Sequence, residues 1–432
     1  MTNPTNPTTY KTPIKLSGDQ SAALEKLKDF ILSEDPIFVL KGYAGTGKTT
    51  MLHELLKLRQ NDPFEGLNLY FTAPTNKAVK ELAKAINEEA KTIYSLLGLR
   101  LTEDEDRGKE LIETKKEYDF GIDPIIVVDE SSMVSTLVLD ILQKGAFLGD
   151  WRIIFVGDPA QLNPVHEEIS PCWNVHTNGN EFTLREVIRY DDELLALSLH
   201  IRETKNKAEL IIENDFNELT NRGVVRLGRP DWRNKITQFS LEDWDNVKVC
   251  AWRNKTVNEY NALIRKSLGF NQRLCVGERV LMASNHENFS VDDEFIIGSV
   301  SESVKSEITY LSNGNKAEIE IPIWQAVAED GSVFTIARDK PALDVFLSVL
   351  ANRAKQLDGY SRKKAWSEFF NVRDSYHHFR YGYAMTAHRL QGSTCKSIFV
   401  DQVDVLSNPK EQEALRCMYV ACTRAQESVY LI

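Results

Sequence analysis

One segment constrains the fold of this chain more than any other: residues 42–49 read Gly-Tyr-Ala-Gly-Thr-Gly-Lys-Thr. A short apolar run at residues 37–40 precedes it, and a segment of helical character follows at residues 50–56. A strand, a glycine-rich turn and a helix in this order are typical of a P-loop, whose backbone N–H groups surround nucleotide phosphates. Lys48 is expected to contact the terminal phosphates, and the Thr49 hydroxyl is expected to bind Mg²⁺. The segment therefore predicts a nucleotide site.

A second apolar run, at residues 125–128, ends in two carboxylates, Asp129 and Glu130. In a P-loop enzyme the first such carboxylate holds Mg²⁺ opposite Thr49, usually through water. The second is placed to polarise the attacking water as a general base. Without a P-loop upstream, the pair would be better explained as the solvated end of a strand.

The loop after a third apolar run, at residues 152–156, carries groups that suit two ligands. Gln161 follows the run closely enough to reach the γ-phosphate or its water, as a sensor of hydrolysis. Asn163, Pro164 and Val165 come next and are placed to contact a second ligand. Outside this context the loop would be only a turn.

Composition limits the class of protein. A chain of 432 residues exceeds what one core usually serves, so two to four domains are expected. The six cysteines are scattered without a CxxC pair, which disfavours a zinc site and fits a reducing cytoplasm. No apolar run approaches the ~20 residues of a membrane span, so no membrane partner is expected. The net charge of −11 supplies no global attraction for nucleic acid, although a local groove can still be basic.

Strand and helix signals divide the chain into regions. Residues 16–189 alternate between the two, as in a parallel α/β sheet, and a second α/β pattern begins near residue 224. The predicted strands of these regions are residues 37–40, 68–72, 125–128, 152–156 and 247–251, and residues 256–268 are predicted to be a helix. Residues 98–121 are polar and suit either a projecting hairpin or a flexible acidic loop.

Residues 277–337 are rich in short apolar segments and predict a small barrel inserted in the second region. Its predicted strands are residues 279–282, 294–299, 307–311, 317–321 and 332–336. Residues 343–371 are predicted to be helical.

An ordered series of motifs between residues 16 and 424 resembles the superfamily 1 helicases, and within them the RecD-like branch. Besides the segments above, the series contains Leu-Ser-Gly-Asp-Gln at 16–20, Phe-Thr-Ala-Pro-Thr-Asn-Lys-Ala at 71–78, Thr-Ile-Tyr-Ser-Leu-Leu at 92–97, Leu-Arg-Glu-Val-Ile-Arg at 184–189, Tyr-Ala-Met-Thr-Ala-His-Arg-Leu-Gln-Gly-Ser-Thr at 383–394 and Met-Tyr-Val-Ala-Cys-Thr-Arg-Ala at 418–425. The resemblance implies an ATP-dependent DNA helicase, with ATP and Mg²⁺ as cofactors, that moves 5′ to 3′ on single-stranded DNA and unwinds duplex DNA.

The resemblance also implies a role for individual residues. The catalytic residues that it implies are Lys48, Asp129, Glu130, Gln161, Arg189 and Arg424, the last being an arginine finger. The ATP-binding residues are Gln20, which reads adenine, and Gly42, Ala44, Gly45, Thr46, Gly47, Lys48, Thr49, Thr50 and Gly392. The DNA-binding residues are Pro74, Thr75, Asn76, Thr92, Tyr94, Asn163, Pro164, Val165, Thr386, His388 and Gln391. The Mg²⁺ ligands are Thr49 and Asp129.

Three positions depart from the family pattern. Tyr94 stands where histidine is usual, Asn163 replaces a common proline, and Arg389 replaces a common lysine. None of these changes removes a catalytic group, and the ring of Tyr94 can still stack on a base, which is worth ~1–3 kcal/mol.

The family architecture implies two RecA-like domains with insertions. The implied division is a first RecA-like domain at 14–97 and 122–185, a pin hairpin at 98–121, a second RecA-like domain at 186–276 and 377–432, and an accessory domain at 277–376 with an SH3-like barrel and a helical part. Residues 1–13 are rich in Thr, Asn and Pro and are expected to form a disordered tail.

The implied partners are single-stranded DNA and junctions of single- and double-stranded DNA. Single-strand-binding proteins and proteins of DNA replication, repair or recombination are compatible further partners, and a working monomer in the cytoplasm of a bacterium or of a phage host is expected. Two other motor functions stay open at this point, a translocase that mainly displaces bound proteins and an RNA-directed helicase. A nucleotide-gated strand-binding module without turnover is the alternative from another class.

Overall fold

The computed structural model describes residues 15–103, 110–114, 120–148, 151–164, 167–188, 192–284, 286, 289–310 and 316–432. The chain forms two compact units: unit 1 contains residues 1–223 and 410–426, and unit 2 contains residues 224–409 and 427–432. The tail predicted at 1–13, the acidic segment 104–108, Val165 and Arg189 lie outside the described residues.

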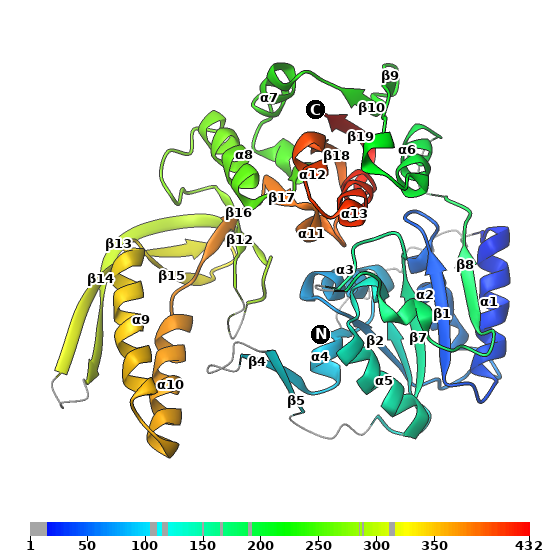
Figure 1. Cartoon of the computed structure of the whole chain (residues 1–432), viewed down its shortest axis with the longest axis horizontal. Helices are drawn as coiled ribbons and strands as arrows, with labels where there is room; N and C mark the ends of the chain where they lie inside the picture. The colour runs from blue at the N-terminus through cyan, green and yellow to red at the C-terminus, as the bar shows by residue number, and fades with distance from the viewer. Residues whose placement is uncertain are drawn as a thin grey trace, which may run out of the picture. The chain divides into compact units, whose positions relative to one another are not determined.

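Unit 1 is built on a sheet whose described strands have the order β3-β2-β6-β7-β1-β8 (Figure 1). Every pairing along this order is parallel. The strands are β1 (Ile37–Gly42), β2 (Leu69–Ala73), β3 (Ala90–Thr92), β6 (Ile125–Val128), β7 (Arg152–Gly157) and β8 (Glu181–Leu184). The apolar runs predicted as strands at residues 37–40, 68–72, 125–128 and 152–156 correspond to β1, β2, β6 and β7. The predicted parallel α/β fold is therefore confirmed.

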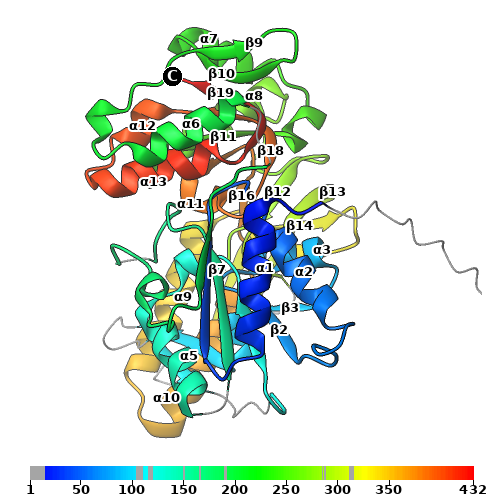
Figure 2. The same ribbon diagram turned by 90° about the vertical axis from the view of Figure 1, so that its right-hand side faces the viewer.

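The strands are apolar throughout because both faces of the sheet are covered. In β1, Phe38 and Leu40 belong to one hydrophobic core, whereas Ile37 and Val39 belong to the other. Helices α1, α2 and α3 pack on the first face, and α5 packs on the second (Figure 2). The helices of unit 1 are α1 (Gly18–Ile31), α2 (Lys48–Leu58), α3 (Asn76–Ile86), α4 (Ile93–Leu96), α5 (Thr136–Leu148), α6 (Asp192–Glu203) and α13 (Glu411–Cys422), with short 3₁₀ helices at Ser131–Met133, Pro171–Asn174 and Lys207–Glu209.

The polar stretch between the third and fourth sheet strands contains a hairpin. Strands β4 (Leu99–Glu103) and β5 (Glu110–Thr114) pair in antiparallel register, with Leu99 opposite Thr114. Of the two structures that the sequence left open here, the described residues therefore form a hairpin.

A second sheet, in the order β17-β11-β18-β19-β10-β9, belongs mostly to unit 2, and its edge strand β9 belongs to unit 1. Strand β11 pairs in parallel with both β17 and β18, and the boundary between the units passes within β10 and β19. The strands are β9 (Asp215–Asn217), β10 (Arg222–Arg226), β11 (Val247–Ala251), β17 (Ala384–Thr386), β18 (Cys395–Val400) and β19 (Ala425–Leu431). The helices are α7 (Arg229–Ile236), α8 (Asn254–Ser267), α11 (Ala387–Leu390) and α12 (Gln402–Leu406), with a 3₁₀ helix at Glu242–Asp245.

The core of this second sheet is aromatic. The ring of Trp232 lies 5.0 Å from that of Tyr260 and 5.6 Å from that of Phe399, measured between centroids. All three side chains are almost fully buried. These contacts fix α7 and α8 against β18, because large rings bury much apolar area in defined orientations.

An antiparallel sheet of order β15-β14-β13-β12-β16 forms the β-rich part of unit 2. Its strands are β12 (Arg279–Met282), β13 (Glu294–Tyr310), β14 (Lys316–Ala328), β15 (Val333–Ala337) and β16 (Phe379–Tyr381). The prediction of separate strands at 294–299 and 307–311 is wrong, because β13 runs through both. Residues 301–304 between them are exposed, so they carry no apolar signal. The likeness to an SH3 barrel stays a prediction.

The helical stretch predicted at 343–371 consists of two helices that pack on each other, α9 (Lys340–Lys355) and α10 (Gly359–Asp374). The break lies at Gln356, which ends α9, and at Gly359, whose φ of 55° favours glycine. Buried residues of β14, α9 and the segment after α10 form a small core beside them, which includes Ile321, Leu343 and Tyr376.

Candidate functional site

The P-loop follows β1 and leads into α2, as the sequence predicted. Gly45 and Gly47 have φ values of 79° and 85°, which favour glycine. A Cβ at Gly47 would lie 2.1 Å from Nε2 of Gln20. The side chain of Gln20 is buried and donates a 3.2 Å hydrogen bond to the carbonyl of Thr46. Gln20, the candidate adenine reader, therefore packs directly against the loop.

Lys48 is the first residue of α2, and its ammonium group lies inside the curve of the P-loop. It donates hydrogen bonds of 2.7 Å to the carbonyl of Gly42 and 3.2 Å to that of Tyr43. The next residue, Thr49, is exposed. The loop thus combines a cation, a hydroxyl and the N-terminus of a helix, which is the donor set that nucleotide phosphates require.

Asp129 and Glu130 follow β6, next to β7 and near the P-loop. Burial and the adjacent charge of Glu130 raise the pKa of Asp129 to about 7, and the charge of Lys48 opposes this shift. Glu130 has a φ of 51°, and among the described residues its buried Oε2 atom has no hydrogen-bond partner. Two crowded carboxylates of this kind fit a divalent cation, because Mg²⁺ prefers oxygen ligands and would offset their repulsion.

Gln161 is buried in the loop after β7, where its backbone N–H donates a 3.1 Å hydrogen bond to the carbonyl of Asp158. Asn163 donates a side-chain hydrogen bond to the carbonyl of Glu168, and Pro164 is buried. This loop leaves the sheet beside β1, so it lies next to the P-loop.

Arg424, the candidate arginine finger, belongs to unit 1 together with the P-loop. It follows α13, is 6% exposed, and donates hydrogen bonds of 3.1 Å to the carbonyl of Val420 and 3.2 Å to Oγ1 of Thr423. The second phosphate-binding candidate, Arg189, lies outside the described residues. Its neighbour Ile188 donates a 2.9 Å backbone hydrogen bond to the carbonyl of Gly45, so the chain leading to Arg189 runs along the P-loop.

The DNA-binding candidates of unit 1 lie at the ends of β2 and β3. In the parallel register of these strands Ala73 is opposite Thr92, so the two following turns are neighbours. Pro74 follows β2. Thr75 is the N-cap of α3, which begins at Asn76, and its side chain accepts a 3.2 Å hydrogen bond from the N–H of Ala78. Thr92 caps α4 in the same way.

Tyr94 is partly buried, because its ring packs against the hydrophobic core of unit 1.

The candidates of unit 2 lie at the end of β17 and in α11. Thr386 ends β17 and is opposite Ala251 of β11. His388 is exposed, whereas Gln391 is buried, and Gly392 has a φ of 79°. Gly392 lies in unit 2, although the other ATP-binding candidates, from Gln20 to Thr50, lie in unit 1.

Arg389, which replaces the common lysine, forms a 3.3 Å ion pair with Asp292.

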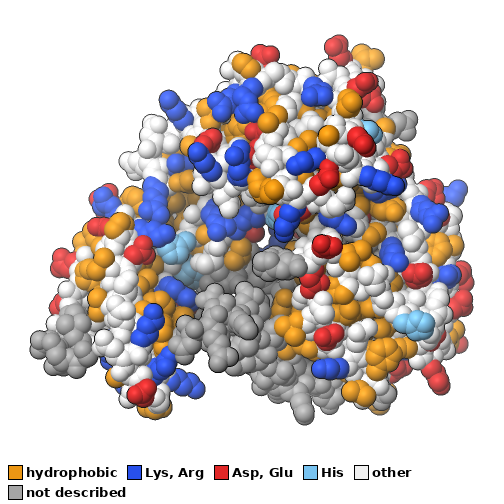
Figure 3. Space-filling view, in the orientation of Figure 1, with side chains coloured by type: hydrophobic (Ala, Val, Ile, Leu, Met, Phe, Trp, Pro, Cys, Tyr) orange, Lys and Arg blue, Asp and Glu red, His pale blue; other side chains and the backbone are white. Residues whose placement is uncertain are grey.

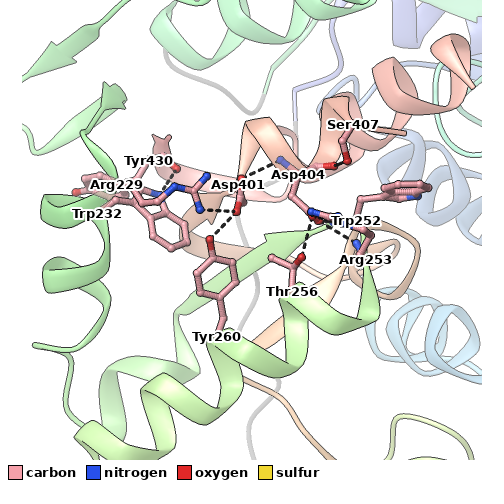
Figure 4. A network of polar contacts seen from close by, with 10 residues as sticks. All are labelled: Arg229, Trp232, Trp252, Arg253, Thr256, Tyr260, Asp401, Asp404, Ser407 and Tyr430. Carbon is pink, nitrogen blue, oxygen red and sulfur yellow. Dashed lines mark hydrogen bonds and ion pairs between the residues drawn. The ribbon is translucent and has the colours of Figure 1, made fainter. Parts of the chain in front are cut away.

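A polar network fixes the same edge of this sheet (Figure 4). Oδ2 of Asp404 accepts hydrogen bonds of 2.7 and 2.9 Å from the backbone N–H groups of Trp252 and Arg253, and Oδ1 accepts one of 2.8 Å from Thr256. Burial raises the pKa of Asp404, but the hydrogen bonds from Arg253, Thr256 and Trp252 together lower it by more, so the pKa lies below its usual value. The network anchors the loop after β11 to α12.

Two family models match the chain. The model described as an AAA domain matches residues 15–229, and the model described as a UvrD-like helicase C-terminal domain matches residues 381–432. The second match contains the two C-terminal motifs, and the first contains the P-loop and both carboxylates.

The chain is also similar to two viral proteins over most of its length. It is 26% identical over 488 residues to the uncharacterised protein R530 of Acanthamoeba polyphaga mimivirus, a match that covers 94% of this chain and 98% of that protein. It is 24% identical over 420 residues to the ATP-dependent DNA helicase dda of Enterobacteria phage T4, with coverage of 91% and 93%. The chain is a superfamily 1 helicase of the RecD-like branch. Its enzyme class is therefore that of ATP-dependent DNA helicases, and the family resemblance of the motifs is confirmed.

Solved structures of Pif1 helicases share the fold of this superfamily 1 helicase. A Pif1 helicase studied at forked double-stranded DNA matches with a TM-score of 0.52 at 15% identity, over 96% of this chain and 92% of that one. Pif1 from Bacteroides, in complex with ADP-AlF3 and single-stranded DNA, matches with a TM-score of 0.50 at 16% identity and the same coverage. At these identities the likeness concerns the fold alone. Among the described residues, no helix combines the length and apolar character needed to cross a bilayer.

Sequence motifs did not assign a role to several residues that the helicase places beside its P-loop. Tyr43, Arg202, Arg416 and Tyr419 line a pocket of about 240 Å³ in unit 1, and the guanidinium of Arg202 lies 3.8 Å from the centroid of the Tyr43 ring. The available signal was weak: Arg416 and Tyr419 are three residues apart, a spacing that puts two side chains on one face only if the segment is helical.

Proposed function

We propose that this helicase uses ATP hydrolysis to move 5′ to 3′ along single-stranded DNA and to unwind duplex DNA. One observation carries the proposal. In unit 1 the candidate residues for ATP binding and hydrolysis follow β1, β6 and β7, and the candidate DNA-binding residues follow β2 and β3, all at one edge of a parallel sheet. Because β2 pairs directly with β6, a structural change at Asp129 and Glu130 is transmitted to the turn after β2, which would bind the DNA strand. The 5′-to-3′ direction rests on the family resemblance.

In this proposal unit 1 binds and hydrolyses ATP. Gln20 reads adenine, and the P-loop from Gly42 to Thr50 surrounds the phosphates, with Lys48 at the terminal ones. Thr49 and Asp129 hold Mg²⁺, which neutralises phosphate charge when bound. Glu130 accepts a proton from the attacking water, Gln161 contacts that water or the γ-phosphate, and Arg189 and Arg424 stabilise the charge that develops on the phosphate.

The strand is held by both units. Pro74, Thr75, Asn76, Thr92 and Tyr94 contact it in unit 1, with Asn163 to Val165 as the link to the γ-phosphate sensor. Thr386, His388 and Gln391 contact it in unit 2. ATP binding and hydrolysis change the two grips in alternation, because only one of the two nucleotide states offers γ-phosphate contacts.

Two further segments serve the duplex junction. We assign the β4–β5 hairpin as the separation pin and the antiparallel sheet with α9 and α10 as an SH3-like accessory part. The helicase then acts as a monomer on junctions of single- and double-stranded DNA in the cytoplasm, alongside single-strand-binding, replication, repair or recombination proteins.

ATP turnover in the presence of different strands tests this function. We expect single-stranded DNA to stimulate turnover more than RNA of the same length. Lys48→Ala should abolish the stimulated rate, whereas Lys57→Ala, on the exposed side of the same helix, should leave it unchanged. Equal stimulation by RNA would favour the RNA-directed alternative, and no stimulation by either polymer would contradict the proposal.

A further inference from the structure

The hydroxyl group of Tyr419 joins three motifs of unit 1. It accepts a 3.1 Å hydrogen bond from the P-loop N–H of Ala44 and donates one of 2.9 Å to Oδ2 of Asp158. Tyr419 is 3% exposed and Asp158 is fully buried, so these bonds form away from water. A phenol has one proton to donate and lone pairs to accept with, and both capacities are used here.

Arg416 lies one turn before Tyr419 on α13 and holds the same loop from its other side. Its guanidinium donates hydrogen bonds of 2.7 Å to the carbonyl of Pro159 and 2.5 Å to the carbonyl of Gln161. Burial lowers the pKa of Arg416, and the nearby charge of Asp158 opposes that shift. The remaining oxygen of Asp158, Oδ1, accepts a 2.9 Å hydrogen bond from the N–H of Ala160.

The same helix leads directly to Arg424. Thr423 donates a 2.7 Å hydrogen bond to the carbonyl of Tyr419 and accepts one of 3.2 Å from the guanidinium of Arg424. Tyr419 is thus connected on one side to the P-loop and the loop of Gln161, and on the other to the candidate arginine finger.

We propose that Tyr419 and Arg416 are positioning residues that hold the Gln161 loop and the P-loop in register with the helix that ends at Arg424. The inference rests on the proposed function, since it concerns how the groups around the γ-phosphate are brought together. Neither residue is proposed to touch the reacting atoms. Their effect is on turnover rather than on ATP affinity, because the groups that they align act in the transition state.

The decisive variant is Tyr419→Phe, which removes the hydroxyl and keeps the buried ring. The measurement is steady-state ATP turnover, with and without single-stranded DNA. Loss of a buried hydrogen bond to a charged group predicts a fall in kcat of about ten- to a hundredfold. The KM for ATP should change less than about threefold. Tyr360→Phe is the matched control, because Tyr360 is 82% exposed.

A double variant separates positioning from general stability. Asp158→Asn weakens the same hydrogen bond from the other side, so Tyr419→Phe combined with Asp158→Asn should lose no more kcat than the more damaging single variant. Arg416→Lys should retain more turnover than Arg416→Ala, and thermal unfolding of Tyr419→Phe should stay close to that of the unmodified chain. Additive losses of kcat that follow a drop in unfolding temperature would show a purely structural role and overturn the inference.

The outcomes also distinguish the inference from the function on which it rests. If the unmodified chain hydrolyses ATP without stimulation by DNA, the proposed function fails, while the ratio of kcat between chain and variant still tests Tyr419. If DNA stimulates turnover and Tyr419→Phe stays within twofold of the unmodified kcat, the inference alone is wrong. An unmodified chain without any turnover would overturn both.

Discussion

The backbone N–H of Asp129 donates a 2.8 Å hydrogen bond to the carbonyl of Thr72. Thr72 lies in β2, three residues before Thr75, the cap of α3 and a candidate contact to the DNA strand. The candidate Mg²⁺ ligand and the candidate strand-binding turn are therefore joined through one hydrogen bond and a short piece of chain. This connection is the physical basis on which we expect nucleotide state and strand grip to be coupled in unit 1.

Glu130→Gln should separate binding from hydrolysis. The amide has nearly the shape of the carboxylate but cannot accept a proton from water, so turnover should fall by about 10²–10⁴-fold. Affinities for ATP and for the strand should change little. Steady-state turnover and equilibrium strand binding measure the two effects. Glu88→Gln, at an exposed ion pair with Arg59, is the control, and near-normal turnover of Glu130→Gln would remove its assignment as the base.

Arg424→Ala should lower turnover far more than it lowers ATP affinity. An arginine that stabilises the transferred phosphoryl group contributes about 10³–10⁵ to the rate. Arg59→Ala, a substitution of a surface arginine, should cost at most the ~1 kcal/mol of stability typical of an exposed ion pair. Single-turnover hydrolysis together with nucleotide binding measures the split. Unchanged kcat in Arg424→Ala would exclude the arginine finger.

Acid should weaken the antiparallel sheet of unit 2 through His377. Burial and the stacked ring of His286, 4.2 Å away between centroids, lower the pKa of His377 to about 4. The unfolded chain therefore binds more protons than the folded one between about pH 6.5 and pH 4, and stability falls as the pH drops through this window. The neutral ring is also required by geometry, since Nδ1 accepts a 3.2 Å hydrogen bond from Thr335 N–H.

Denaturant unfolding from pH 7 to pH 4 measures this effect. The stability difference between the unmodified chain and His377→Gln should shrink as the pH falls, by roughly 1.4 kcal/mol per pH unit at most. His176→Gln, at an exposed histidine, should leave the pH dependence unchanged. A stability difference that is the same at both ends of the range would contradict the prediction.

Strand affinity should depend on salt in spite of the net charge of −11. Figure 3 shows Lys and Arg side chains interspersed with acidic ones on this face of the molecule. Such basic side chains can contact DNA phosphates locally. Each phosphate neutralised should contribute about −0.7 to the log–log slope of affinity against salt. Fluorescence titration with a short single strand at several salt concentrations measures the slope. A flat response would count against a basic strand-binding surface.

The fold was predictable where one signal dominated. Strands β6, β11 and β12 have the predicted ends because each is a compact apolar run with mostly buried residues. The length of β13 was not predictable, since residues 301–304 face solvent and the strand continues through pairing with β14. Hydrogen bonding along a hairpin can extend a strand without any apolar pattern, and that pairing is a property of the folded chain.

In the candidate site, too, local motifs were predictable from the sequence and long-range contacts were not. The P-loop and the Asp129–Glu130 pair are local motifs, which a sequence displays directly. The bond between Tyr419 and Asp158 joins residues 261 positions apart, and no spacing rule connects them. The pKa of Asp129 likewise depends on burial and on the approach of Lys48, which only the folded sheet supplies.

The proposed motor opens duplex DNA from a 5′ single-stranded tail. The most direct test is unwinding, with ATP and Mg²⁺, of two matched duplexes that carry either a 5′ or a 3′ tail. We expect the 5′-tailed duplex alone to open, and Lys48→Ala to open neither. Opening of only the 3′-tailed duplex would contradict the direction. Failure to open either duplex while DNA still stimulates ATP turnover would contradict unwinding and favour a translocase that displaces bound proteins.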